Sequence, residues 1–543
     1  MKRESTMMIV SDIHLPLDTV EGDVCFRALK ILKRFGICPS DAKAHIFRRS
    51  VDARRRSDIH FVYSVAVTGS FTENVLDAVR QRTYRSVSVS EASMPQYTPG
   101  TQRLPAPPVV VGSGPAGLFA ALMLAEHGYM PVLLERGGNI EERQAAVSRF
   151  AENRLLDTET NIQFGAGGAG TFSDGKLVTR VNDPLTAYVM ETFVRFGAPC
   201  DILTLAKPHI GTDILSGVIS SMLTEITRLG GRICYHTRLE DLECSCGAVT
   251  AAITNAGDVP VGVLLLATGH SARDTYEMLM RHGLPLTAKP FSVGVRIEHL
   301  QADIDEALYG AFAGHPALGH AEYHLSHNTH ERGVYSFCMC PGGQVVAAAS
   351  EIGGVVVNGM SNHRRDGRNA NSAISVSVFP EDFGGTPRGA LAFQRGIEEA
   401  AFRAGGGDYA VPLVTLGDFL CGRCDTFPSR IQSTYMGGDA YRLASPDAYL
   451  PGFVTAALRD AFPAFGRKIR GFDTSDALLS GAETRTSAPI RILRAEETRT
   501  VPGYRNLYPV GEGAGYAGGI TSAALDGIRS ALAVMSVYAP LQQ

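Results

Sequence analysis

Val109-Val-Val-Gly112-Ser-Gly114-Pro-Ala-Gly117 is an apolar run of residues that leads into a glycine-rich turn. A stretch with helical character follows, and Pro131-Val-Leu-Leu-Glu135 then forms a second apolar run that ends in a carboxylate. A strand, a tight turn, a helix and a second strand are the parts of a dinucleotide-binding unit. The amino end of the helix is its expected phosphate site, because backbone N–H groups point outward there.

Each position in this unit has a physical role. Gly112 permits the tight turn, Gly114 lets the backbone approach a pyrophosphate, and Gly117 lets helix and strand pack closely. Seventeen residues separate Gly117 from Glu135, which can accept hydrogen bonds from ribose hydroxyls. Arg136 follows directly and is a further candidate for cofactor contact.

The 543-residue chain is too long for one ordinary hydrophobic core, so about three domains or subdomains are expected. Hydrophobic residues make up 45% and charged residues 20%, which is typical of a soluble globular protein. We find no run of about 18 apolar residues that suggests a membrane span, and no convincing signal peptide. These observations predict a cytoplasmic protein.

Ten cysteines without a regular framework are expected to be reduced and mostly buried. Cys421-Gly-Arg-Cys424 could be a redox or metal pair, but no second pair stands at zinc spacing. Cys338-Met-Cys340 and Cys244-Ser-Cys246 are interpreted as strand or turn residues. A histidine-rich patch is interpreted as a surface loop, so no metal site is predicted. Its members are His315, His320, His324, His327 and His330.

Residues 1–92 are expected to form a separate module, followed by a semi-rigid, proline-rich linker over residues 93–108. Strand-like and helical patterns alternate through the module. The expected strands are residues 7–15, 42–49, 59–67 and 85–89, and the expected helices are residues 23–35 and 73–80. The order βαββαβ predicts a small ferredoxin-like α+β domain.

The module is basic, with 15 Lys and Arg against 11 Asp and Glu, whereas the rest of the chain carries a net charge of −8. Much of the excess lies in Arg48-Arg-Ser-Val-Asp-Ala-Arg54-Arg-Arg56. Such a cluster can bind nucleic acid or phosphate. Without an RNA-binding signature, an edge that docks on the acidic remainder is the favoured interpretation, and nucleic acid is not an expected partner.

The expected fold class is α/β, with a Rossmann-like dinucleotide-binding domain in two parts, residues 109–288 and 471–543. Val259 to Ala267 is interpreted as another buried parallel strand, and Thr268 and Gly269 at its carboxyl end permit close approach of a ligand. Residues 289–470 show short alternating strands with glycine-rich connections. This pattern predicts a β-rich substrate domain inserted into the first.

The closing segment, Leu507 to Ile520, is a strand followed by a loop with five glycines in nine residues, and a helix is expected to open at Thr521. A helix amino end can hold the negative charge that a flavin gains when it is reduced. Glu512 would reach the ribityl or phosphate region of such a cofactor. The cofactor-binding candidates here are Gly511, Glu512, Gly518, Gly519 and Ile520.

Together these segments resemble the FAD-binding domain of glutathione-reductase-type flavoproteins. More narrowly, nearly the whole chain is similar to a family of FAD-dependent dehydrogenases of unassigned substrate, in which a small N-terminal domain precedes the flavin fold. The carrying motifs are Ser50-Val-Asp-Ala-Arg54, Gly165-Ala-Gly-Gly-Ala-Gly-Thr-Phe-Ser-Asp-Gly-Lys176, Pro208-His-Ile-Gly-Thr-Asp213, Gly269-His-Ser-Ala-Arg273, Lys289-Pro-Phe, Asn358-Gly-Met-Ser361 and Glu483-Thr-Arg-Thr-Ser487. The resemblance implies FAD as the cofactor.

Gly165 to Gly170 matches G-x-G-x-x-G a second time but lacks a preceding strand, so a second nucleotide fold is not expected. The resemblance implies that this loop lies along FAD, and a purely structural glycine loop is the alternative. Lys176 is a candidate for polarising the flavin. The cofactor-binding candidates in the loop are Gly167, Gly168, Thr171 and Ser173.

The resemblance places several acid, base and cation candidates near the domain junction. They are His209, Lys289, Arg296, Glu298, His299 and Arg485. Hydride transfer to or from flavin N5 needs a proton donor or acceptor and a cation that orients the substrate. Arg485 is the first choice for contact with substrate or flavin, with a buried ion pair to Glu483 as the alternative. His209 could be a base, although a structural histidine is the simpler interpretation.

These features predict an FAD-dependent oxidoreductase of the dehydrogenase or reductase type, which transfers hydride between a small-molecule substrate and flavin N5. Because no second complete strand-turn-helix unit is evident, no stable NADPH domain is expected, although NAD(P)H could bind transiently. A flavin-dependent monooxygenase is one alternative. A flavin-stabilised binding protein, whose basic module contacts RNA or a partner, is the other.

Overall fold

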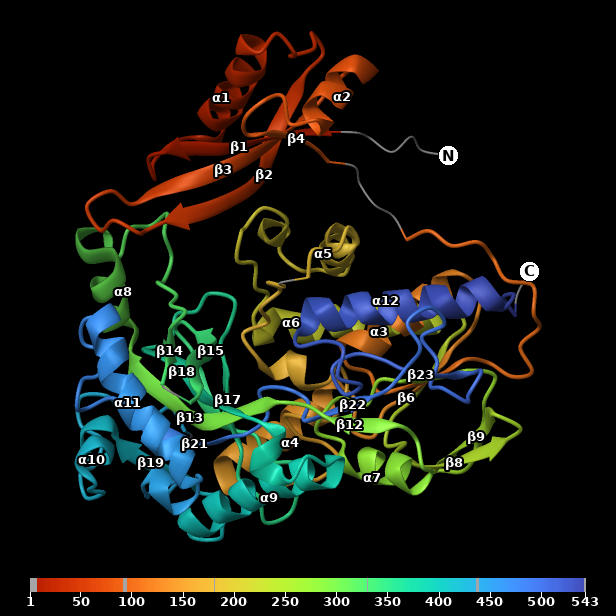
Figure 1. The fold of residues 1–543 in the computed structure, drawn as a ribbon, viewed down its shortest axis with the longest axis vertical. Helices are drawn as coiled ribbons and strands as arrows, with labels where there is room; N and C mark the ends of the chain where they lie inside the picture. Colours follow the sequence, from red (N-terminus) through yellow and green to blue (C-terminus); the bar gives the residue numbers. More distant parts are fainter. Residues whose placement is uncertain (1–6, 91–94, 180, 330, 436–438, 542–543) are drawn as a thin grey trace.

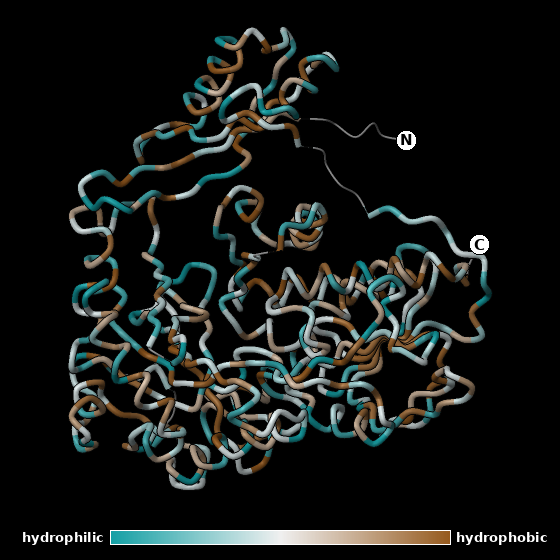
Figure 2. The backbone as a smooth tube through the Cα atoms, in the orientation of Figure 1, coloured by the Kyte–Doolittle hydropathy of each residue, from teal (hydrophilic) through white to brown (hydrophobic). Residues whose placement is uncertain are grey.

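The computed structural model describes residues 7–90, 95–179, 181–329, 331–435 and 439–541. Residues 93 and 94 of the expected linker, and His330 of the histidine-rich patch, lie outside the described residues. A small N-terminal module stands above a larger body of mixed α/β structure (Figure 1). Figure 2 shows hydrophobic residues gathered where the strands lie, in the module and in the body.

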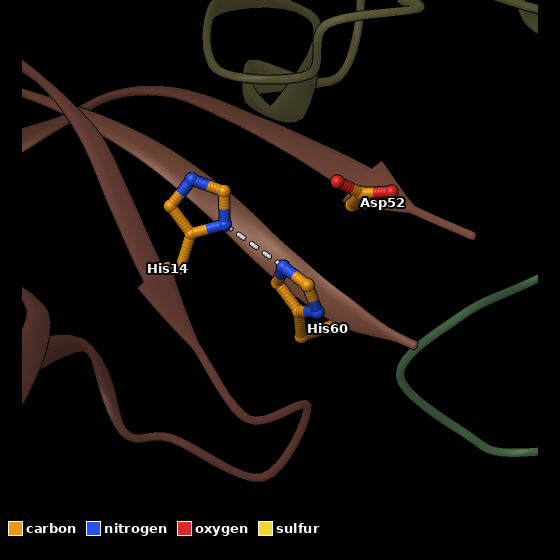
Figure 3. Close-up of side chains that lie close together, drawn as sticks. All are labelled: His14, Asp52 and His60. Atoms are coloured by element: carbon orange, nitrogen blue, oxygen red, sulfur yellow. Dashed lines mark hydrogen bonds between the residues drawn. The ribbon is translucent and has the colours of Figure 1, made fainter. Parts of the chain in front are cut away.

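The N-terminal module has the expected βαββαβ order. Its elements are β1 (Met7–Leu15), α1 (Glu21–Arg34), β2 (Lys43–Asp52), β3 (His60–Thr68), α2 (Glu73–Arg80) and β4 (Val87–Ser90). The antiparallel sheet has the order β2-β3-β1-β4, and both helices cover one face (Figure 1). Buried Ile13 and Phe61 join the core with the helices, while His14 and His60 lie on the helix-free face (Figure 3).

The basic edge of the module docks on the body, as the sequence predicts, but through its backbone. Arg49 N–H donates to the Thr204 carbonyl at 2.7 Å, and Ala206 N–H donates back to the Arg49 carbonyl at 2.9 Å. The contact therefore extends the β2 edge by a short strand-like pairing with the loop at residues 204–206. The expectation that acidic side chains would provide the docking surface does not hold for this contact.

The body contains a five-stranded parallel sheet with the order β23-β11-β5-β6-β7. Its strands are β5 (Val109–Val111), β6 (Val132–Leu134), β7 (Arg232–Cys234), β11 (Leu264–Leu266) and β23 (Leu507–Pro509). One face packs against α3 (Pro115–Glu126), α6 (Thr212–Arg228) and α12 (Ile520–Val537). The chain leaves β5 toward β6 on one side and returns as β11 on the other, so a ligand crevice is expected at its carboxyl end.

The expected strand at residues 259–267 was too long. Only β11 enters the parallel sheet, whereas β10 (Val259–Pro260) pairs in a separate antiparallel sheet with β9 (Ala248–Thr254), which pairs with β8 (Leu239–Ser245). Pro260 has no N–H to donate, which limits further pairing. Gly262 then passes so close to Ala106 that an added Cβ would lie 2.0 Å from its carbonyl oxygen.

Helix α12 corrects the expectation that no segment could span a membrane by length and composition. Among the described residues it is the one helix that is both long and apolar enough. Its hydrophobic residues, however, pack with α3 in the core on one face of the parallel sheet, and 67% of its apolar window is buried. This is the behaviour of a core helix.

A second, seven-stranded sheet has the order β14-β15-β18-β13-β21-β19-β20. Its strands are β13 (Phe291–Leu300), β14 (Ser326–Asn328), β15 (Gly333–Cys340), β18 (Asn369–Val378), β19 (Val411–Thr415), β20 (Tyr441–Leu443) and β21 (Leu478–Glu483). Its helices are α8 (Gln301–Tyr309), α9 (Pro387–Ala404), α10 (Leu416–Cys421) and α11 (Gly452–Lys468). Because β21 pairs with β13 and β19, this sheet extends beyond the expected division at residue 470.

Further helices and short strands lie outside the two large sheets. They are α4 (Ile140–Asn153), α5 (Thr186–Arg195), α7 (Arg273–Arg281), the pair β12 (Leu286–Ala288) and β22 (Ile490–Ile492), and the pair β16 (Gln344–Ala347) and β17 (Val357–Met360). The domain boundaries predicted from the sequence stay predictions, because strand pairing alone does not show which parts of the chain fold as independent units.

Cysteines and histidines differ in part from expectation. All ten cysteines are free, as predicted, but only Cys340 is fully buried, and four are exposed: Cys200, Cys244, Cys246 and Cys421. A cysteine in a short apolar stretch of sequence is therefore not always buried in this fold. The histidine patch does have carboxylate partners, which come from distant segments. The pairs are His315 with Asp18, His320 with Asp305, and His327 with Asp460.

Candidate cofactor site

A cavity of about 350 Å³ opens at the carboxyl end of the parallel sheet and reaches the seven-stranded sheet. Its walls come from the β5–α3 turn, the loop before α12 and the Ala267–Ala272 segment on one side. Segments around Phe337, Asn358 and Arg485 form the other side. The cavity therefore lies at the position that the strand order predicts for a ligand.

The first glycine turn has the geometry that its sequence predicts. Gly112 has φ +98°, and an added Cβ would lie 2.4 Å from the Ala267 carbonyl oxygen. A Cβ on Gly117 would lie 1.9 Å from the Gly112 carbonyl oxygen, so glycine is required for close packing of α3. Gly114 differs, because its only near neighbour within 4 Å would be the Gly168 Cα at 3.8 Å.

Three further glycines border the cavity and have open space where a side chain would begin. Added Cβ atoms on Gly269, Gly518 and Gly519 would meet nothing within 4 Å. The space beside these backbones is thus part of the cavity, and a large ligand can contact the main chain directly. α3 and α12 both begin at its wall, after Gly114 and Gly519. Two helix amino ends facing one cavity suit an anionic dinucleotide such as FAD.

Most of the sequence-predicted site residues border this cavity. Those that do are Gly112, Gly114, Glu135, Arg136, Gly168, Ser173, Lys176, Thr268, Gly269, Arg485, Glu512, Gly518, Gly519 and Ile520. Those that do not are Gly117, Gly167, Thr171, Gly511 and His209. The structure brings together fourteen positions that are spread over some 400 residues of sequence.

The residues set back from the cavity hold its loops from behind. Thr171 is fully buried and donates from its hydroxyl to the Ala166 carbonyl at 3.5 Å. Gly167 lies against it, since an added Cβ would be 2.2 Å from the Thr171 hydroxyl. Gly511 N–H donates to the Asp526 carboxylate at 2.7 Å. These positions support the cavity shape, and their direct contact with a cofactor stays a prediction.

Glu135 organises the glycine loops. One carboxylate oxygen accepts from the backbone N–H and hydroxyl of Ser113, at 3.0 and 2.5 Å. The other accepts from the N–H groups of Gly137 and Gly165, both at 3.0 Å. These four donors occupy the usual capacity of a carboxylate. The predicted contact with ribose hydroxyls would therefore have to share or replace one of them.

Lys176 and His209 lie side by side but have different surroundings. Lys176 pairs with the buried Asp174 at 2.5 Å and still borders the cavity. His209 donates from Nε2 to the His363 carbonyl at 2.9 Å and stacks on that ring. Burial and the nearby Arg365 lower the pKa of His209. This geometry favours the structural interpretation of His209, and its role as a base stays a prediction.

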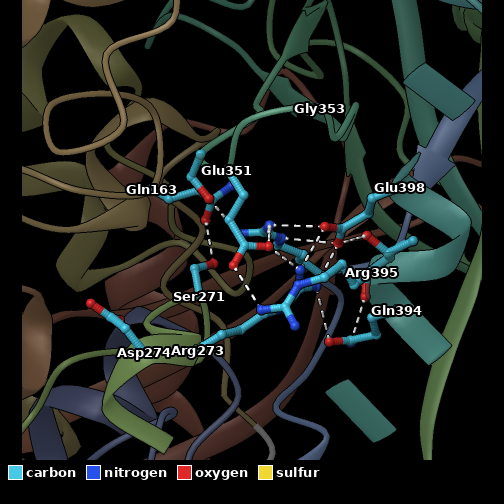
Figure 4. A network of polar contacts seen from close by, with 12 residues as sticks. Gln163, Ser271, Arg273, Asp274, Glu351, Gly353, Gln394, Arg395 and Glu398 are labelled. Carbon is cyan, nitrogen blue, oxygen red and sulfur yellow. Dashed lines mark hydrogen bonds and ion pairs between the residues drawn. The ribbon is translucent and has the colours of Figure 1, made fainter. Parts of the chain in front are cut away.

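Arg485 borders the cavity and pairs with Glu398 in a buried cluster of charges. Figure 4 shows Arg273, Glu351 and Glu398 of this cluster. Arg485 donates to both carboxylate oxygens of Glu398, at 3.2 and 3.1 Å, and to the Ser350 hydroxyl at 2.7 Å. The predicted alternative, an ion pair with Glu483, is wrong. Glu483 pairs with Arg296 at 2.8 Å, because β21 ends at Glu483 and the chain then turns toward α9, which carries Glu398.

The carboxyl group of Glu512, at the wall of the cavity, has an unusually high pKa. Burial raises the pKa of Glu512 to about 7. The nearby imidazole of His270 lies 3.8 Å away, and burial with the charges of Arg485 and Arg273 lowers the pKa of that ring to about 3. Lys289 is the cation that opposes the shift of Glu512. Glu512 therefore changes charge near neutral pH while His270 stays neutral.

This shift predicts that FAD affinity decreases as the pH rises through 7. Below pH 7 the Glu512 carboxyl is neutral, and above it a negative charge faces the anionic cofactor. We expect the Kd for FAD to rise about tenfold between pH 6 and pH 8, an interaction of ~1.4 kcal/mol. Titration of the apoprotein with FAD at each pH, followed by quenching of flavin fluorescence, measures this Kd.

The matched control is Glu512→Gln, which keeps the shape and cannot ionise. Its Kd should stay constant over the same range. An equal pH dependence in both proteins would rule out Glu512 as the titrating group.

Several residues that border the cavity were not predicted from the sequence as site residues. They are Gln163, Arg238, His270, Ser271, Cys338 and Asn358. His270, Ser271 and Asn358 stood in motifs that carry the family resemblance, so a signal was present. Arg238 and Cys338 lie outside those motifs, Arg238 directly before β8 and Cys338 on β15.

An open cavity at the switch point of a parallel sheet, with two helix amino ends on its wall, defines a dinucleotide-binding α/β protein. Residues 290–486 match the family described as "FAD-dependent protein, C-terminal domain-like", and residues 7–68 match a domain of unknown function, DUF8436. A Clostridium beijerinckii protein, described as uncharacterized, is 43% identical over 526 residues, 96% of this chain and 97% of that protein. The chain belongs to the family of this relative, a family of FAD-dependent proteins of unassigned substrate.

Solved structures are similar to this chain only at a low level. L-amino acid deaminase from Proteus vulgaris is 11% identical with a TM-score of 0.33, covering 82% of this chain and 94% of that one. CtdE in complex with FAD is 10% identical with a TM-score of 0.32, covering 80% and 84%. Likeness at this level carries no argument about substrate.

Proposed function

We propose that this protein is an FAD-dependent oxidoreductase that acts on a small molecule bound between the glycine-lined wall and the seven-stranded sheet. The observation that carries the proposal is the cavity itself. Open backbone at Gly114, Gly269 and Gly519 faces charged side chains of Arg485 and Lys176 across one space. When bound, FAD supplies two-electron chemistry, as hydride transfer at its N5 atom.

The residues of the chain have separable tasks in this proposal. The amino ends of α3 and α12 bind negative charge on the phosphates and on the reduced flavin. Arg485, held by Glu398, orients an anionic group of the substrate with a fixed guanidinium plane. Glu512 holds or releases a proton near neutral pH, the range in which a proton carrier is effective.

The test is anaerobic flavin bleaching of the purified protein with NADH, NADPH and a panel of small metabolites. We expect at least one anionic metabolite to bleach the flavin. Arg485→Lys should then raise KM roughly tenfold or more at unchanged FAD content, because the ammonium keeps the charge but loses the bidentate fork. A colourless protein that does not take up FAD, or a yellow protein that no compound bleaches, would contradict the proposal.

Arg395→Lys is the matched control for this variant. Arg395 contacts Glu351 and Glu277 on the outer side of the same cluster and does not border the cavity. Its KM should stay within twofold of the wild-type value, an estimate for a surface ion pair of about 0–1 kcal/mol.

The same preparation separates a dehydrogenase from a monooxygenase. A dehydrogenase or reductase would pass electrons to an artificial acceptor without oxygen, whereas a monooxygenase would couple NADPH consumption to oxygen incorporation into product. Transient binding of NAD(P)H, the proposed cytoplasmic location and the absence of a nucleic-acid partner stand beside this proposal as expectations.

A further inference from the structure

Three potential metal ligands meet on the helix-free face of the N-terminal sheet, far in sequence from the cavity residues (Figure 3). His14 lies on β1, Asp52 on β2 and His60 on β3. Asp52 is directly opposite His60, and His14 is opposite Val62, two positions along β3. Because side chains alternate along strands, this register brings all three to one face.

The distances suit a common ion. His14 Nδ1 and His60 Nε2 are 2.8 Å apart, and one ligand atom from each of the three residues lies within 4.8 Å of the others. In tetrahedral coordination, two imidazole nitrogens bound at about 2.0–2.1 Å to one ion would be about 3.3–3.4 Å apart, so the two hydrogen-bonded rings need to separate by about 0.5 Å and release the proton between them. The Asp52 carboxylate would supply the third ligand.

A hydrogen bond presets the His60 ring for ligation. His60 Nδ1 lies 3.1 Å from the Asp58 carbonyl oxygen, which can only accept, so this nitrogen carries the proton. The lone pair is therefore on Nε2, the atom that faces His14. Donation of the other ring N–H to a carbonyl is the usual arrangement of a metal-bound histidine.

Asp52 is held in place without being enclosed. Arg54 donates to both of its oxygens, including Nε to Oδ1 at 2.9 Å. The Arg54 side chain is 85% exposed, so this pair contributes little stability and can yield to an ion. The carboxylate lies on the same face as the two rings, with its side chain 11% exposed, and its ligand atom is within 4.8 Å of theirs (Figure 3).

We propose that His14, Asp52 and His60 bind a divalent first-row transition-metal ion. Two imidazoles and one carboxylate favour ions such as Zn²⁺, Co²⁺ or Ni²⁺ over Mg²⁺ or Ca²⁺, which prefer oxygen ligands. Three protein ligands on an open sheet face leave further positions for water or an outside ligand. This site does not depend on FAD or on the proposed oxidoreductase activity.

The test uses the full chain after dialysis against a chelator. Calorimetric titration with Zn²⁺ should show one saturable site, and Co²⁺ should give the visible absorption of a nitrogen-coordinated ion. His14→Gln and His60→Gln should each weaken Zn²⁺ binding about 10–100-fold or more, the range seen even for residues that only support ligands. Asp52→Asn should weaken it about tenfold on the same scale.

His45→Gln is the matched control, because His45 is also exposed on β2 and is not part of the cluster. It should bind Zn²⁺ as the wild-type protein does. Because His14 is exposed, His14→Gln should keep the circular dichroism of the wild-type fold. Absence of saturable binding, or equal affinity in the His14, His60 and His45 variants, would overturn the proposal.

Discussion

Gly114→Val is expected to give a folded protein that does not retain FAD. Gly114 has φ −65° and ψ 176°, a conformation open to any residue, and an added Cβ would meet only the Gly168 Cα at 3.8 Å. The valine methyl groups would instead enter the space expected for the pyrophosphate. We expect an affinity loss of roughly 100-fold or more, about 3 kcal/mol of steric conflict.

The flavin absorbance of the purified protein and a fluorescence titration of the apoprotein measure this effect. Gly217→Val is the control, because Gly217 is exposed on α6 and an added Cβ would meet nothing within 4 Å. It should keep FAD at wild-type affinity. Wild-type FAD affinity in Gly114→Val would show that the phosphates do not pass this turn.

Gly117→Ala tests whether the third glycine is needed for close packing of α3 on β5. We expect it to lower the stability of the fold before it affects FAD binding. The new Cβ would lie 1.9 Å from the Gly112 carbonyl oxygen, so α3 must move away from β5. The contrast between Gly114 and Gly117, three residues apart, separates loss of the cofactor from loss of the fold.

Local patterns explain why parts of the fold were predictable. Met7–Leu15 and Glu73–Arg80 were predicted with the bounds that the structure has, because the apolar pattern of the strand and the helical spacing of the helix each lie within the segment. The unit from Val109 to Glu135 was equally readable, since its strand, glycine turn, helix and second strand follow one another directly in the sequence. Elements of this kind can be predicted because the pattern that identifies them lies within the segment itself.

Long-range pairing explains what could not be predicted. The strand at Leu478–Glu483 belongs to the seven-stranded sheet because β13 and β19 flank it, which no local pattern records. The occupied oxygens of Glu135 depend on loops that meet only in the folded chain. The alternative prediction for Arg485, an ion pair with its sequence neighbour Glu483, was wrong for the same reason, because Glu398, 87 residues away, pairs with it.

Glu398→Ala is expected to cause the largest loss of stability. Glu398 is 1% exposed and bridges two arginines, with Arg273 at 2.7 and 2.8 Å and Arg485 at 3.1 Å. Removing its carboxylate leaves two buried guanidinium groups with Glu351 as the one carboxylate near both of them among the ion pairs of this cluster. Breaking a buried ion pair in this way costs about 3–5 kcal/mol, which should lower the Tm of a chain of this length by roughly 3–4 °C.

The pH dependence of this loss distinguishes an ion-pair effect from a packing effect. Although burial acts against ionisation, Arg485 and Arg273 hold the pKa of Glu398 well below its usual range. A depressed folded-state pKa gives stability that is present above the unfolded value and is lost only as pH falls through the folded one. The difference in Tm between wild-type and Glu398→Ala apoproteins should thus stay constant from pH 5 to 8 and shrink only in acid. Glu399→Ala, at the exposed neighbour, should change the Tm by less than about 1 °C, as surface substitutions do. A similar fall in both variants would mean that α9, and not the buried pair, is responsible.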